Sequence, residues 1–147
     1  MDDIFFTNSG QTSLIVDNST AAGVIIVSGS TLSAANSLDL RSSGADTVDT
    51  FTGGKGDDTF RFDTTHAAGL ATGDILAGGG GTDTVAVTLT AASMTAVANT
   101  NGMARIEKIT FAGSGALTAN VAINNGTFVT EIIAGVLYTV VGDVDAR

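Results

Sequence analysis

The sequence predicts an all-β chain that folds as a right-handed parallel β-solenoid, in which short strands stack on those of the neighbouring coils. Three observations lead to this fold class. Thr, Ser, Val, Ile and Ala dominate the 147 residues, a mixture that favours strands. Short apolar runs recur at nearly even spacing between Gly, Asn and Ser. A glycine- and aspartate-rich unit also repeats in the middle of the chain. The length of the chain fits a single domain over residues 1–147.

The first third of the chain consists of strand-like runs. They read "SLIVD", "GVIIVSG" and "SLDLRS" between residues 13 and 42, and each is bounded by small polar residues. No helical period is sustained there. The runs are too short for a sandwich of long hairpins, so they predict stacked coils of one chain.

The repeated unit lies in the middle of the chain. Residues 53–61, "GGKGDDTFR", fit the pattern G-G-x-G-x-D-x-U-x at every fixed position, where U is a large apolar residue, and residues 78–86, "GGGGTDTVA", fit it again. Nine positions before each aspartate lies a degraded copy of the motif, with Asp49 before Asp58 and Asp74 before Asp83. A further fragment, "GADTV" at residues 44–48, carries Asp46 and is out of register with these steps of nine.

The residue types in this motif suit a cation-binding turn followed by a very short strand. Glycine reaches backbone angles that cost other residues energy, so six residues can turn tightly. Carboxylates and exposed carbonyls of such a turn are hard oxygen ligands of the kind that calcium prefers. The candidate calcium ligands are therefore the carboxylates of Asp58 and Asp83 in full motifs, of Asp49 and Asp74 in degraded ones, and of Asp46. The candidate backbone ligands come from Gly53, Lys55, Gly56, Gly78, Gly80 and Gly81.

Other residues near the motifs have ordinary structural explanations. Asp57 occupies a variable position, so we expect a solvated side chain. His66 lies in a polar segment and is expected at the surface. The large apolar residues that follow or precede the turns should form an inward ladder; they are Phe51, Phe60, Phe62, Leu76 and Val85.

These motifs resemble the nonapeptides of the repeats-in-toxin (RTX) family over residues 44–86. The resemblance implies a parallel β-roll with calcium between turns on the same edge, two repeats apart. The chain departs from the pattern because Asp58 and Asp74 are 16 positions apart. If two short repeats fill that gap, Asp58 and Asp74 share an edge. If one long repeat fills it, Asp49 pairs with Asp74 and Asp58 with Asp83. Either way we expect few sites, roughly two to four.

The flanking segments resemble other parts of large secreted RTX adhesins and S-layer proteins. Residues 1–43 are similar to coils that do not bind calcium, and residues 87–147 to further coils with a C-terminal cap. Within the latter, "TAASMTAVAN" at residues 90–99 predicts a short helical insertion with Thr90 as its N-cap, before the strand "IEKITF".

Composition and charge exclude several classes of function. Fifteen acidic residues against 6 basic ones give a net charge of −9, which disfavours nucleic acid and anionic membranes as partners. Thirteen of the acidic residues are Asp, whose short side chain suits oxygen-ligand loops. Without cysteine there is no disulfide or thiolate site, and no apolar run is long enough for membrane insertion. Catalytic motifs such as H-E-x-x-H and G-x-S-x-G are absent, so we predict that the chain is not an enzyme.

Together these features predict a calcium-binding structural module of a secreted or cell-surface bacterial protein, similar to an S-layer protein or adhesin. We expect it to self-associate as a homo-oligomer or lattice, because its terminal segments are apolar rather than polar caps. One alternative is the non-catalytic secretion domain of an exported hydrolase or toxin, which a catalytic domain upstream would favour. Another is an adhesin tip, for which cell-surface polysaccharide is a candidate partner.

Overall fold

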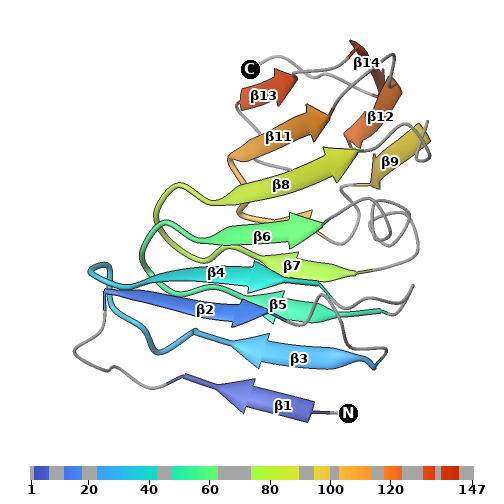
Figure 1. Ribbon diagram of the computed structural model, residues 1–147. Coiled ribbons are helices and arrows are strands. Elements are labelled where there is room, and N and C mark those ends of the chain that lie inside the picture. The colour runs from blue at the N-terminus through green and yellow to red at the C-terminus, as the bar shows by residue number, and fades with distance from the viewer. Residues whose placement is uncertain are drawn as a thin grey trace.

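The computed structural model describes residues 2–6, 12–17, 23–42, 48–62, 74–89, 95–99, 103–113, 118–123, 131–134 and 137–142. Regular structure in these ranges is β-strand throughout, and the strand pairs are parallel (Figure 1). Successive strands alternate between two sheets as the chain winds upward. The predicted all-β parallel solenoid is therefore confirmed.

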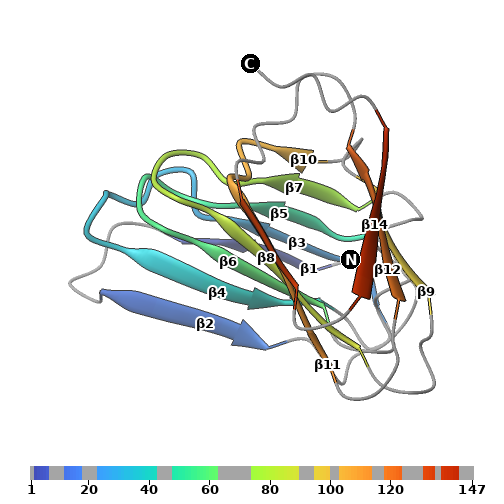
Figure 2. The ribbon, with the colours of Figure 1, turned by 90° about the horizontal axis from the view of Figure 1, so that it is seen from above.

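The two main sheets run the length of the coil. Sheet A has the strand order β1 (Asp2–Phe5), β3 (Ile25–Ser28), β5 (Thr50–Thr52), β7 (Ile75–Ala77) and β10 (Met103–Ala104). Sheet B has the order β2 (Ser13–Asp17), β4 (Ser37–Arg41), β6 (Thr59–Phe62), β8 (Thr84–Leu89), β11 (Lys108–Gly113) and β13 (Glu131–Ala134). Seen from above, sheets A and B form two facing walls (Figure 2).

A third sheet joins the coil in its C-terminal half. Sheet C has the order β9 (Thr95–Asn99), β12 (Thr118–Ile123) and β14 (Leu137–Gly142). Figure 2 shows these strands crossing beside the two main sheets rather than continuing either of them. The coil therefore changes from two strands to three beyond the repeated motifs.

The register fixes the length of one coil. Thr50 pairs with Ile75 in sheet A, and Thr59 pairs with Thr84 in sheet B, so the coil that carries the motifs contains 25 residues. This is longer than two nonapeptides. Of the two arrangements that the sequence left open, the structure has the one with a single long repeat.

Side chains that alternate inward along each short strand make the core. In sheet A, Val27, Phe51, Leu76 and Met103 stack in one inward ladder. In sheet B, Leu40, Phe60, Val85 and Ile109 form another. The two ladders meet between the sheets, where the rings of Phe51 and Phe60 stack with centroids 6.1 Å apart and planes 15° from parallel. The predicted ladder residues Phe51, Phe60, Phe62, Leu76 and Val85 are all buried.

The predicted helix over residues 90–99 is wrong where the structure describes it. Residues 95–99 form strand β9, which pairs in parallel with β12. Thr95 and Val97 are β-branched and alternate with alanines, so the segment extends readily once β12 supplies hydrogen-bond partners. Residues 90–94, with the predicted N-cap Thr90, lie outside the described residues. No helix in the described ranges has the length and hydropathy of a membrane span.

Candidate metal site

The two full motifs form turns that stack directly on each other. Residues 53–58 join β5 to β6, and residues 78–83 join β7 to β8, on the left side of Figure 1. Backbone hydrogen bonds hold the two turns in register, with Gly53 N–H donating to the Ala77 carbonyl at 2.8 Å and Gly80 N–H to the Gly54 carbonyl at 3.0 Å. The sequence motif thus becomes one continuous edge of the solenoid.

Asp58 and Asp83 lie one above the other on this edge. Leu38, Asp58 and Asp83 follow one another in a single inward column, one coil apart. Both aspartates are almost fully buried. The Asp58 N–H donates to Asp83 Oδ1 at 2.8 Å, and the Leu38 N–H donates to Asp58 Oδ1 at 2.7 Å. Asp58 Oδ2 accepts from the Gly54 N–H at 2.7 Å, which closes its own turn. Each carboxylate therefore bridges successive coils through the backbone.

A second pair of aspartates stacks at the other end of the strands. Asp49 and Asp74 precede β5 and β7 of sheet A and are buried. The Asp49 N–H donates to Asp74 Oδ1 at 2.8 Å, while Asp49 accepts from the Ile25 N–H at 3.0 Å and from Ser42 Oγ at 3.1 Å. Asp58 and Asp74 do not share an edge. Asp46 lies outside the described residues.

Two motif glycines hold a space in which oxygen atoms converge. A Cβ atom on Gly53 would collide with the Asp58 carboxylate and with the Gly78 carbonyl oxygen. A Cβ atom on Gly78 would collide in the same way with the Asp83 carboxylate and the Arg105 carbonyl oxygen. At both positions the glycine is crowded by a carboxylate oxygen of its own turn and by a carbonyl oxygen of the next coil. Only glycine leaves them room.

The other predicted backbone positions have distinct roles in the turns. Gly56 is buried, and a Cβ there would collide with the Asn36 carbonyl oxygen of the preceding coil. Gly81 adopts a φ of 107°, which favours glycine. Lys55 is exposed, and Gly80 has only ordinary contacts around the position of a Cβ. These residues are all part of the stacked turns, and their role as ligands remains a prediction.

Asp57 is exposed, as predicted, but the structure gives it a role that the sequence did not suggest. Its Oδ1 accepts a hydrogen bond of 2.8 Å from the N–H of Thr82 in the turn above. The side chain thus links the outer parts of the two turns. A variable motif position gives no signal for such a bond, which depends on the 25-residue spacing of the coil.

Burial makes ionisation of the central carboxylates costly. It raises the pKa of Asp83 from 3.8 to about 7, and the carboxylates of Asp58, Glu107 and Asp57 add to this rise. The hydrogen bond from the Asp58 N–H lowers the pKa and offsets part of the effect. Burial also raises the pKa of Asp58, while the hydrogen bonds from Gly54 and Leu38 lower it. A positive charge beside this column would favour the ionised form.

The donor set fits a hard divalent cation. Asp83 Oδ2 is buried and accepts no hydrogen bond within the described part of the chain, although buried polar atoms normally find a partner. It lies against Gly78 together with the Arg105 carbonyl oxygen. Among the described residues, no three His, Cys, Asp or Glu side chains form a metal-binding group. A cation here would therefore need backbone carbonyls as well as carboxylates, a combination that suits calcium.

The structure also adds an acidic residue that sequence reasoning missed. Glu107 pairs in register with Asp83, and its Oε2 accepts a hydrogen bond of 2.8 Å from the Asp83 N–H. It belongs to no nonapeptide, so the motif does not predict it. A step of 25 residues from Asp83 leads to Lys108, whereas Glu107 lies 24 residues after Asp83, so the coil length alone gives no exact signal for it.

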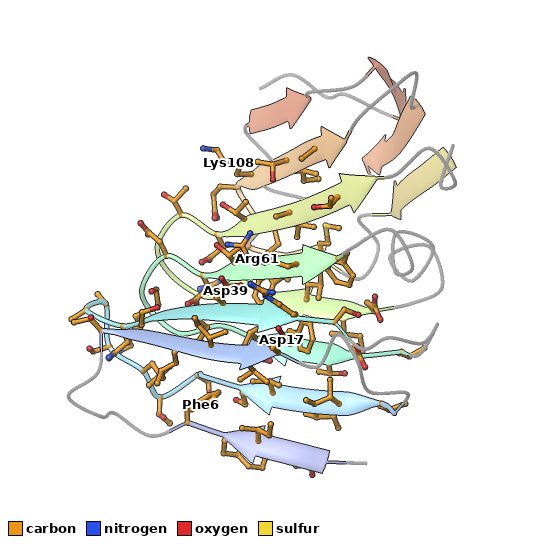
Figure 3. All side chains as sticks on the ribbon, in the orientation of Figure 1. Phe6, Asp17, Asp39, Arg61 and Lys108 are labelled. Carbon is orange, nitrogen blue, oxygen red and sulfur yellow. The ribbon has the colours of Figure 1, made fainter. Side chains whose placement is uncertain are left out.

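The charged side chains on the outer face of sheet B form a separate set. Arg41 Nη1 pairs with Asp17 Oδ2 at 3.2 Å. Arg61 Nε pairs with Asp39 Oδ1 at 2.6 Å, and Figure 3 labels both of these residues. Such surface pairs contribute about 0–1 kcal/mol to stability. These two pairs lie on the solvated face of sheet B and do not involve the buried Asp58 or Asp83.

Comparisons with protein-family models, with curated proteins and with solved structures find no match to this chain. The fold and the site therefore rest on the sequence pattern and the geometry described above.

Proposed function

We propose that this chain is a calcium-binding structural module. The observation that carries the proposal is the stack of the two glycine–aspartate turns, in which Asp58 and Asp83 are buried in register and Asp83 Oδ2 has no hydrogen-bond donor among the described residues. A buried anion without a counter-charge is costly. Calcium would supply the positive charge that keeps these carboxylates ionised within the folded coil.

The residues that would hold calcium are the stacked carboxylates and the carbonyls that crowd the motif glycines. Asp58 with the Gly78 carbonyl, and Asp83 with the Arg105 carbonyl, are the oxygen pairs around Gly53 and Gly78. Asp49 and Asp74 form a second candidate column. Magnesium should substitute poorly, because it demands a stricter octahedral geometry and gives up water reluctantly.

We propose a structural role at the bacterial cell surface or outside the cell, in a protein similar to an S-layer protein or adhesin. The edge strands of the sheets support self-association. At one end, β1 and β2 are the outermost strands of sheets A and B; at the other, β13 and β14 are outermost in sheets B and C. A second copy could pair with these strand edges. A net charge of −9 would oppose such contacts, so bound calcium should promote them.

Calcium titration calorimetry on three aspartate variants tests the proposal. Asp58→Ala and Asp83→Ala should each weaken or abolish calcium binding, since both remove a buried carboxylate from the stacked turns. Asp57→Ala is the control, because it removes from the same turn a negative charge that is exposed rather than buried. Equal losses of affinity in all three variants would indicate general charge screening, and the proposal of a specific site would fail.

A further inference from the structure

The acidic column continues one coil beyond the repeated motifs. Thr84 pairs with Lys108, and Ala77 pairs with Ala104. The connection of residues 105–107 therefore stacks on the turn of residues 78–83, although it is only half as long. Glu107 takes the register position of Asp83 and accepts its N–H. The additional methylene of Glu compensates for the shorter turn, because it carries the carboxylate to the place that the longer turns reach with Asp.

The unsatisfied oxygen of the column lies at this end. Asp58 Oδ2 accepts the Gly54 N–H, whereas Asp83 Oδ2 is buried and accepts no hydrogen bond within the described residues. Asp83 itself is 0 % exposed. Its carboxylate and the Arg105 carbonyl oxygen crowd the same point beside Gly78. Because Asp83 Oδ2 has no hydrogen-bond donor among the described residues, a proton or a cation at this point would satisfy it.

Arg105 directs its carbonyl into this space through an unusual backbone conformation. Its φ of 54° is positive, which costs a non-glycine residue energy. The guanidinium group of Arg105 is exposed and donates to the Gly79 carbonyl at 3.2 Å, so the side chain is held on the adjacent turn. The backbone oxygen, rather than the charged side chain, therefore faces Gly78 and Asp83.

We propose that a divalent cation, with calcium as the fitting ion, binds between the turns 78–83 and 105–107, with the carboxylates of Asp83 and Glu107 and the Arg105 carbonyl as ligands. Glu107 and Arg105 lie outside the nonapeptide motifs, so this site extends the acidic column beyond the second motif turn, and it rests on the proposed calcium-binding function. It joins the last motif turn to the coil that begins with β10. Calcium bound there would order β10 and β11 against β7 and β8, so the effect of the metal would extend beyond the repeats.

Calcium stoichiometry in a matched set of variants tests this site. Glu107→Gln removes the charge but keeps the length and an oxygen that can accept the Asp83 N–H, so the fold is retained. Glu131→Gln is the control, because Glu131 is the other glutamate of the chain. It lies on β13, where it pairs with Lys108 of β11. Asp58→Asn tests the motif edge independently. Titration calorimetry and calcium content after gel filtration give the number of bound ions, and circular dichroism checks the fold.

The proposal predicts that Glu107→Gln binds one calcium ion fewer than the wild type, while Glu131→Gln keeps the full number. If Glu107→Gln binds as many ions as Glu131→Gln, with unchanged affinity, the additional site does not exist. In that case a loss of binding in Asp58→Asn would leave the proposed function intact. If the wild type itself binds no calcium, both the additional site and the proposed function are wrong.

Discussion

Truncation of Phe60 is expected to remove much of the stability of the coil. The ring is 0 % exposed and stacks on Phe51 from the opposite sheet at 6.1 Å. In its own ladder it lies between Leu40 and Val85, so a cavity at Phe60 would border three buried side chains. Phe→Ala at a buried site typically costs about 3–5 kcal/mol. An aromatic pair stabilises a fold by about 0.5–1.5 kcal/mol beyond the area that it buries. Because Phe60→Ala also removes this pair, we expect a loss in the upper half of the range of about 3–5 kcal/mol.

Urea unfolding followed by circular dichroism at fixed calcium concentration measures this loss. Phe5→Ala is the matched control, because the same change is made at a side chain that is 71 % exposed. A surface substitution of this kind should change the free energy of unfolding by about 0.5 kcal/mol or less. If Phe60→Ala costs less than about 1 kcal/mol, or no more than Phe5→Ala, the inward ladder is wrong.

Three further predictions follow from the stacked turns. Gly78→Ala should destabilise the chain by about 1–3 kcal/mol, because the new Cβ would collide with the Arg105 carbonyl oxygen. Gly80→Ala should be nearly neutral in the same unfolding assay, because its Cβ would have only ordinary contacts. Equal losses of stability in the two variants would contradict the crowding around Gly78. In calcium-free buffer the folded state holds the Asp83 proton more tightly than the unfolded state, since its pKa is raised from 3.8 to about 7. The stability that Asp83 protonation contributes should be complete below pH 3.8 and disappear as the pH rises through about 7. Calcium should bind more tightly over the same rise in pH. If Asp83 is not buried, thermal melts and calcium titrations at several pH values would show neither change. Light scattering should show particles that grow with calcium concentration, and a strictly monomeric chain at high protein and calcium concentrations would argue against self-association.

The fold and the identity of the central aspartates could be predicted from the sequence because the motif is strict. Glycines at fixed positions followed by one large apolar residue specify a tight turn and an inward side chain. That pattern correctly predicted the burial of Phe60 and Val85. It also predicted the aspartates at the start of the two sheet B strands, which the structure places in one buried column.

The spacing of the coils could not be predicted in the same way. The step of nine residues describes each motif pair but not the return path, which contains residues 63–73 and adds no recognisable repeat. The pairing of Asp49 with Asp74 therefore stayed one of two alternatives until the strand register decided it. Glu107 was missed for the same reason, since its position is fixed by pairing with β8 rather than by any local pattern.

Residues 95–99 form a strand instead of the predicted helix because a tertiary partner outweighs the local composition. Alanine-rich residues 90–99 have a composition that favours about two helical turns, but strand β12 offers hydrogen bonds along the whole of residues 95–99. The β-branched residues in that stretch then favour the strand. Propensity over ten residues is too weak to predict which of the two wins.

The response of the fold to calcium tests the central claim most directly. Thermal unfolding would be followed by circular dichroism in millimolar calcium, in excess chelator and in millimolar magnesium. A ligand that binds only the folded state at 100 times its Kd stabilises that state by about 2.7 kcal/mol for each site, and each kcal/mol shifts the Tm of a chain of this size by about 2–4 °C. We therefore expect calcium to raise the Tm by about 5 °C or more per site and to increase the strand signal, with a much smaller effect of magnesium. Coincident melting curves in calcium and in chelator would contradict the account.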